Sequence, residues 1–280
     1  MFIETHAHLN DKAIDADRGE VIEKAFKSGV AKIIEIACSA AEWAPAETLC
    51  AAYGGAITAA FGIHPQYIDE LTPENLKTLG GFLKKDICRG IGEIGLDYYW
   101  DNSKKDAQSK LLEAQLELSN SSGRVCVFHA RNGKDARTDN AYADLAQELR
   151  KQWSLNSRKR ARGVLHCFSG SWEDAKAGLD LGLFLGVNGT FTYKKNDELR
   201  AIVKKAGFAN IVLETDCPYL PVQSKRGKRN DPSSIPEIAR AVAEYLGVKP
   251  EGLAEFTTVN AEELFFPKKS DKTDFWGPWE

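Results

Sequence analysis

Short apolar runs recur along this chain and alternate with amphipathic segments. Eight of the runs have the length and composition of β-strands: residues 1–6, 31–38, 56–63, 88–94, 125–129, 163–167, 182–188 and 210–215. Because few polar residues interrupt them, these runs are typical of parallel strands that are covered on both faces. Four of the intervening segments have helix-like periodicity or end in a helix-closing glycine: residues 20–29, 104–123, 196–207 and 234–247.

This alternation predicts an α/β fold, a single-domain (β/α)₈ TIM-like barrel, because strand–helix units fill the chain without a linker. We expect the barrel to occupy residues 1–266 and a polar tail to follow over residues 267–280. The segment 132–162 is longer than the other connections, and its end, residues 150–162, is strongly basic. Such a cluster is either a solvated helix face or a contact for nucleic acid, and both interpretations stay open here.

The composition is that of an ordinary globular protein, with 43% hydrophobic residues, 28% charged residues and a formal net charge of −3. This charge excludes a general polyanion binder, so any contact with nucleic acid must come from a local basic patch. No apolar stretch approaches the ~20 residues that cross a bilayer, and no secretory signal is visible. The six cysteines are scattered without a C-x-x-C pair, as in a reduced compartment. We expect a cytoplasmic monomer with no membrane contact, and a nuclear location stays open if the source is eukaryotic.

Histidines and acids stand at or near the ends of six of the predicted strands. The residues concerned are His6, His8, His64, Glu93, His129, His166 and Asp216. In a closed barrel the C-terminal strand ends meet at one rim, whereas an open doubly wound sheet gathers ligands at a single crevice. A lone histidine at a strand end is more often a hydrogen-bonded core residue. The conjunction of all five histidines with two acids instead favours a metal site.

The spacing of these residues suggests how metal ions would be held. His6 and His8 are two residues apart, so both side chains point to one face of a strand and can bind one ion. Glu93, flanked by glycines, is the best candidate to bridge two ions. We assign Asp216 to the first ion, and His129 and His166 to the second. Two divalent ions (Mg²⁺, Mn²⁺ or Zn²⁺) would clamp a phosphoryl or carbonyl group and activate water.

Eight ordered motifs make this chain similar to the TatD-type deoxyribonuclease family of metal-dependent hydrolases. The motifs are THAHL, GIHP (62–65), GEIGLDY (92–98), FHAR (128–131), HCFSG (166–170), ETDCPYLP (214–221), RGKRNDP (226–232) and TTVNAEELF (257–265). The resemblance implies a TIM-like barrel, one or two divalent metal ions and phosphodiester hydrolysis, commonly 3′→5′ exonuclease action on DNA. It also implies the ligand set given above, with His64 lining the site. The family usually has Asp two residues before the first histidine, where this chain has Glu4.

Catalytic roles follow as hypotheses. Asp216 is the best general base, Glu93 assists it, and His64 binds the phosphate or protonates the leaving oxygen. The expected substrate is DNA, as a single strand or at 3′ ends. Its contacts are expected from polar and basic residues after strands five and eight: Arg131, Arg226, Lys228 and Asn230.

Several alternatives remain at this point. Tyr98, Tyr99 and Trp100 either stack on an unpaired base or close the top of the barrel. The same metal chemistry would serve an amidohydrolase or an aminoacyl-tRNA deacylase. A metal-stabilised binding protein is the non-enzymatic alternative, and the complete ligand set argues against it.

Overall fold

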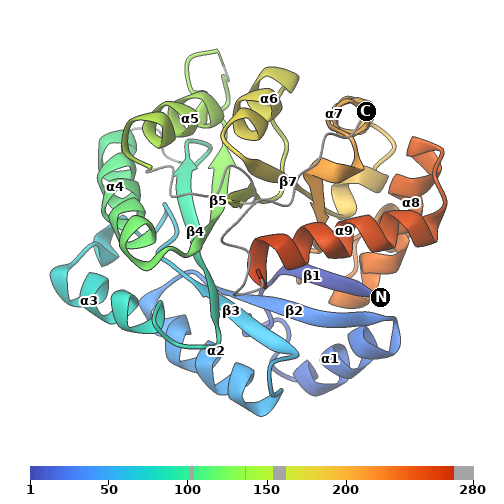
Figure 1. Cartoon of the computed structure of the whole chain (residues 1–280), viewed down its shortest axis with the longest axis horizontal. Helices are drawn as coiled ribbons and strands as arrows, with labels where there is room; N and C mark the ends of the chain where they lie inside the picture. The colour runs from blue at the N-terminus through green and yellow to red at the C-terminus, as the bar shows by residue number, and fades with distance from the viewer. Residues whose placement is uncertain (101–103, 136, 154–161, 268–280) are drawn as a thin grey trace.

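The computed structural model describes residues 1–100, 104–135, 137–153 and 162–267 (Figure 1). Its eight strands form one sheet in the order β1 to β8, and every neighbouring pair is parallel. The strands are β1 Phe2–Ala7, β2 Val30–Ala37, β3 Ile57–Phe61, β4 Cys88–Asp97, β5 Val125–Arg131, β6 Gly163–Leu165, β7 Leu183–Val187 and β8 Ile211–Leu213. This arrangement confirms the (β/α)₈ barrel.

Helices follow the strands and cover the outside of the barrel (Figure 1). They are α1 Arg18–Lys27, α2 Ala40–Ala52, α3 Pro73–Phe82, α4 Lys105–Ser122, α5 Ala141–Gln152, α6 Trp172–Asp180, α7 Asp197–Ala206, α8 Ile235–Leu246 and α9 Pro250–Phe265. One hydrophobic cluster fills the space between helices and sheet. In the part of the chain that the structure describes, no helix is both long enough and apolar enough to span a bilayer.

The additional helix α9 closes one end of the barrel. It lies across β1 and contacts β8 (Figure 1). Its buried residues Ala261, Leu264 and Phe265 join a second hydrophobic cluster with strand residues such as Ile3 and Val212. Because apolar side chains fill that end, polar side chains of the interior are left to the opposite end, where the strands terminate.

The barrel closes between β8 and β1, at a junction that we call the seam. The Glu4 side chain holds it together as well as backbone hydrogen bonds. Thr215 donates its backbone N–H to Glu4 Oε1 at 2.9 Å, and Asp216 donates its own to the carbonyl of His6 at 3.0 Å. The backbone N–H of His8 donates to the carbonyl of Cys217 at 2.9 Å. These bonds begin beyond the last residue of β8, so they hold the start of the following loop against β1.

Glycine allows β4 and β5 to approach closely beside the histidines. Gly95 has a φ of +144°, and a Cβ there would overlap the carbonyl oxygen of His129. A Cβ at Gly92 would lie 2.6 Å from that of Val127. Side chains on these two strands are therefore brought into direct contact at the barrel mouth.

The basic cluster expected at residues 150–162 lies mostly outside the described residues. Within the structure, Arg150 and Lys151 belong to the last turn of α5. Arg162 is buried, with its guanidinium 3.9 Å from the centre of the Trp153 ring, so it does not belong to an exposed patch. The tail predicted from residue 267 also lies outside the described part, apart from Pro267.

Candidate metal centre

The seven residues singled out from the sequence converge at the C-terminal end of the barrel. Three groups of donor atoms within 4.8 Å of one another contain them all. They come from β1 and its loop, the loop after β3, β4, β5, and the loops after β6 and β8. The prediction that separate strand ends supply one centre therefore agrees with their positions.

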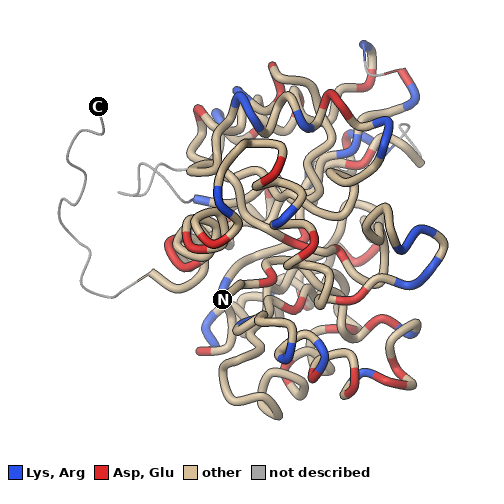
Figure 2. Tube along the Cα trace, turned by 90° about the vertical axis from the view of Figure 1, so that its right-hand side faces the viewer, with Lys and Arg blue, Asp and Glu red and all other residues tan. Residues whose placement is uncertain are grey.

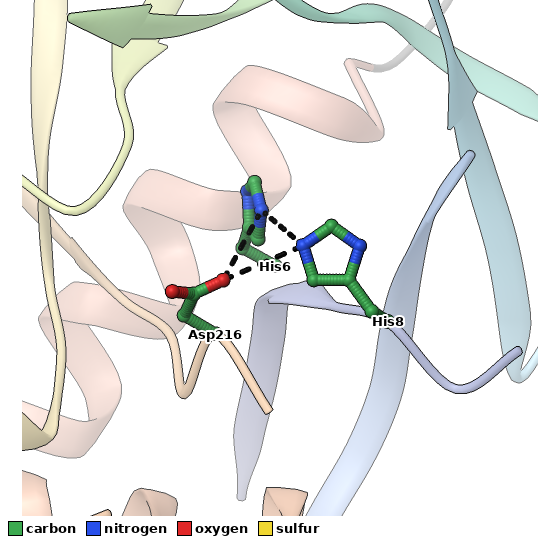
Figure 3. Close-up of side chains that lie close together, drawn as sticks. All are labelled: His6, His8 and Asp216. Carbon is green, nitrogen blue, oxygen red and sulfur yellow. Dashed lines mark hydrogen bonds and ion pairs between the residues drawn. The ribbon is translucent and has the colours of Figure 1, made fainter. Parts of the chain in front are cut away.

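His6, His8 and Asp216 form the first subsite (Figure 3). The two Nε2 atoms lie 3.3 Å apart, and Asp216 Oδ1 lies 3.8 Å from that of His6 and 3.4 Å from that of His8. Glu93 Oε2 is 3.4 Å from His6 Nε2 and 3.9 Å from His8 Nε2. Donors that share an ion at about 2.1 Å lie roughly 3–4 Å apart, so these four atoms fit around one cation.

The other oxygen of Glu93 faces the second subsite, formed with His129 and His166. Glu93 Oε1 lies 2.7 Å from His129 Nδ1 and 2.9 Å from His166 Nε2. The carboxylate is thus divided between two groups of imidazoles. A carboxylate that bridges two cations requires this division.

His64 faces Glu93 Oε1 but has a different hydrogen-bonding pattern. Its Nε2 is 3.6 Å from that oxygen, and its Nδ1 accepts the backbone N–H of Gln66 at 3.1 Å. Burial, followed by the charge of His129, lowers the pKa of His64 to about 3, so the ring is neutral. Since Nδ1 is an acceptor, the single proton of the neutral ring lies on Nε2. His64 therefore points a hydrogen-bond donor into the centre.

Two buried acids that sequence reasoning missed stand behind the histidines. Asp97 Oδ2 lies 3.0 Å from His129 Nε2. Glu214 Oε1 lies 3.5 Å from His166 Nδ1 and accepts the backbone N–H of Cys167 at 2.6 Å. Acids in such positions orient metal-binding imidazoles. The signal was present in the motifs, because GEIGLDY and ETDCPYLP each contain a second acid besides the proposed ligand.

Glu4 acts on His6 through the backbone. Its Oε1 accepts the N–H of His6 at 2.9 Å as well as that of Thr215. Burial raises the pKa of Glu4 to about 8. Glu4 Oε2 and His6 Nδ1 have no hydrogen-bond partner among the described residues. The longer acid at this position therefore holds the chain around His6 in place, and we find no hydrogen bond from it to the imidazole.

The electrostatics of the centre favour carboxylates that are ionised. Burial alone would raise the pKa of Glu93, but the charge of His166 and the hydrogen bond from His129 outweigh it and hold the pKa well below its usual range. The same competition between burial and a histidine, His8, lowers the pKa of Asp216. Buried anions ringed by imidazole nitrogens suit divalent cations of intermediate softness, so the residues present fit such ions.

Cys38 also reaches the centre, although its sequence context suggested only a small buried hydrophobe. Its Sγ lies 3.7 Å from Glu93 Oε2 and 3.9 Å from His8 Nδ1. Burial raises the pKa of the Cys38 thiol to about 12, so the sulfur is neutral beside the carboxylate. All six cysteines are free thiols, as expected.

The predicted substrate contacts divide into exposed and buried residues. Arg131, Arg226 and Lys228 are exposed near the barrel mouth. Asn230 requires a correction, because it is fully buried and donates to the carbonyls of Thr215 and Tyr219. Its amide stabilises the loop after β8 and is not available to a substrate. Basic and acidic positions are otherwise interspersed along the chain (Figure 2).

Comparison with known proteins gives consistent matches over nearly the whole chain. A family described as "TatD related DNase" matches residues 3–266. A metal-dependent hydrolase of Bacillus subtilis, YabD, is 32% identical over 95% of this chain and 99% of its own length. A protein of Pantoea vagans named "3'-5' ssDNA/RNA exonuclease TatD" is 30% identical over 92% of this chain and 96% of its own. The crystal structure of the TatD homologue YjjV from Escherichia coli superposes with a TM-score of 0.84 at 28% identity, covering 94% and 97% of the two chains.

Proposed function

Because the chain belongs to the TatD-related DNase family of metal-dependent hydrolases, we propose that it hydrolyses phosphodiester bonds of DNA, removing nucleotides from 3′ ends. The observation that carries this proposal is the division of the Glu93 carboxylate between two groups of imidazoles. A centre for two cations suits phosphodiester hydrolysis, because two charges can stabilise both the attacking and the leaving oxygen. The name of the Pantoea vagans relative supports the same direction of attack on single strands.

We infer that two divalent ions of the Mg²⁺, Mn²⁺ or Zn²⁺ class bind here. His6, His8, Asp216 and Glu93 Oε2 would hold one ion, and His129, His166 and Glu93 Oε1 would hold the other. When bound, such ions supply positive charge to the phosphate and lower the pKa of water.

Side chains of the protein would accept and donate protons during the reaction. Asp216 lies at the edge of the first subsite, where its carboxylate can accept a proton from the attacking water. His64 presents Nε2–H to the centre, where it can donate a hydrogen bond to a phosphate oxygen or to the leaving oxygen. Arg131, Arg226 and Lys228 would attract the polyanion from the rim.

The test uses purified full-length protein stripped with a chelator. Mg²⁺, Mn²⁺ or Zn²⁺ is then added back with single-stranded DNA labelled at its 5′ end. We expect stepwise shortening of the DNA by the wild type, and none by Glu93→Gln. Glu255→Gln, an exposed acid on α9 at the closed end of the barrel, is the matched control and should remain active.

Two results would overturn the proposal. One is the absence of metal-restored DNA shortening by the wild type. The other is release of an amino acid from aminoacyl-tRNA by the same samples without any release of nucleotides. The second result would place the protein among the metal-dependent hydrolases that act on a carbonyl carbon.

A further inference from the structure

Two aromatic side chains and an arginine form an exposed cluster at the barrel mouth. Tyr99 and Trp100 follow β4 directly and are 37% and 68% exposed. Arg131 ends β5, and its guanidinium lies 3.8 Å from the centre of the Tyr99 ring and 5.5 Å from that of Trp100. The two rings meet edge to face, with centroids 5.0 Å apart. We call these three residues the aromatic shelf.

The aromatic shelf is connected to the second subsite through short links. The backbone N–H of Tyr99 donates to Asp97 Oδ1 at 2.9 Å, and the other oxygen of Asp97 contacts His129. Arg131 lies two residues after His129 on the same strand, so both side chains point to the same side of the sheet. A group resting on the shelf would therefore lie beside the residues proposed to hold the second ion.

Tyr98 has a different role from its two neighbours. It is buried, and its hydroxyl donates to Asp144 Oδ2 at 3.0 Å. Tyr98 therefore packs the loop against α5. Of these three aromatic residues, only Tyr99 and Trp100 expose ring surface to solvent. Tyr98 thus fits the expectation that aromatic residues close the top of the barrel, and its two neighbours remain candidates for stacking on a base.

The chemistry of the aromatic shelf matches one kind of ligand. Large aromatic surface is costly to leave in water, and rings such as these stack on other planar π systems. Among the described residues, Arg131 takes part in no ion pair within 4.0 Å. An aromatic face beside a guanidinium suits a planar ring that is joined to an anionic group.

We propose that the aromatic shelf binds an unpaired base of the substrate, with Arg131 against the adjoining phosphate. This inference rests on the proposed nuclease function and names the residues that would hold a base of the strand. In a duplex both faces of a base are covered by its neighbours, so only an unpaired or frayed end can rest on Trp100. The shelf would thereby hold the strand beside the second subsite.

Binding to metal-free protein tests the proposal without hydrolysis. The probe is a fluorescein-labelled single-stranded oligothymidylate, followed by fluorescence anisotropy in the presence of EDTA. We expect Trp100→Ala to raise the Kd about 5- to 150-fold, as for the loss of one stacked base. Trp100→Phe should retain most of the affinity. Phe256→Ala removes a comparably exposed aromatic (49%) from α9 at the closed end and should change nothing.

Two further measurements separate stacking from charge. On an oligonucleotide whose 3′-terminal nucleotides are abasic, wild type and Trp100→Ala should bind equally. Arg131→Gln should reduce the salt dependence of log K by about 0.7, as for one lost phosphate contact on a single strand.

The outcomes distinguish this inference from the proposed function. If the wild type shortens DNA but Trp100→Ala binds normally, or loses the same affinity on the abasic strand, the aromatic shelf is refuted and the nuclease stands. Absence of measurable binding by the wild type also refutes the shelf. If binding depends on Trp100 and on the base but no DNA is cleaved, the shelf stands and the nuclease proposal fails.

Discussion

Glu4 Oε1 accepts the backbone N–H of Thr215 at 2.9 Å, although the two residues lie 211 positions apart in the chain. The same oxygen accepts the N–H of His6. His6 and Asp216, the neighbour of Thr215, both belong to the first subsite. One buried carboxyl group thus holds β1 against the loop after β8 and sets the spacing of two proposed ligands.

Replacing Glu4 should destabilise the protein, and more so when the replacement has no oxygen to accept the two backbone N–H groups. Glu4→Ala leaves two buried N–H groups without an acceptor, and we expect the free energy of unfolding to fall by about 2–4 kcal/mol. Glu4→Gln keeps one acceptor oxygen and should cost less. Urea unfolding of the metal-free proteins measures both. Equal losses in the two variants would show that the carbonyl-type oxygen is not what holds the seam.

Removing His64 should affect catalysis and leave metal binding intact. Its Nδ1 is occupied by the N–H of Gln66 and its Nε2 carries the proton, so the neutral ring has no lone pair to offer an ion. For His64→Ala we expect kcat to fall about 10²- to 10⁴-fold, the usual effect of losing an acid–base group. Bound metal per chain, measured by elemental analysis, should be unchanged, whereas His129→Ala should lose metal. A matching loss of metal from His64→Ala would make His64 a ligand.

Asp97 should tune metal affinity through His129. Its Oδ2 lies 3.0 Å from His129 Nε2, while the opposite nitrogen faces Glu93. Weakening this contact in Asp97→Asn should reduce the affinity for the second ion about 10- to 100-fold, as for other acids behind metal-binding histidines. Competition with a chelating dye measures the change. Asp69→Asn, an exposed acid in the loop after β3, is the control, and an equal effect there would remove Asp97 from this role.

Metal binding should stabilise the fold, because the donors come from strands far apart in sequence. At one hundred times the Kd, one bound ion adds about 2.7 kcal/mol to the free energy of unfolding. Adding Mn²⁺ or Zn²⁺ to chelator-stripped protein should therefore raise the Tm, and Glu93→Gln should lose most of this rise. An identical Tm with and without the ions would contradict a site assembled by the fold.

The sequence was sufficient for the barrel because parallel strands carry a strong local signal. Apolar runs predicted all eight strands, but β6 and β8 are only three residues long. The predicted strands 163–167 and 210–215 extend beyond the observed ones. The residues after each short strand lie next to apolar residues in the sequence, so the pattern gives no sign that the strand has ended. The sequence did not predict that α9 closes one end of the barrel, since this position depends on contacts with β1 and β8.

The convergence of the seven residues could be predicted because a barrel brings all strand ends to one rim. Asp97, Glu214 and Cys38 were missed because the residues that they contact lie 30 or more positions away. The motifs contain the two acids as second carboxyl groups, but they do not show which histidine each acid meets. Asn230 was misplaced for the same reason. It stands in a basic rim sequence, but the loop turns its amide inward onto backbone carbonyls. Spacing shows which strand end a residue occupies, and only packing shows which way it points.

Titrating chelator-stripped protein with Mn²⁺ while following the shortening of 5′-labelled single-stranded DNA tests the two-ion centre most directly. The division of Glu93 between two subsites leads us to expect that activity rises until two ions are bound per chain and then stays constant. Activity that is complete at one ion per chain, or DNA that stays intact at every metal ratio, would contradict it.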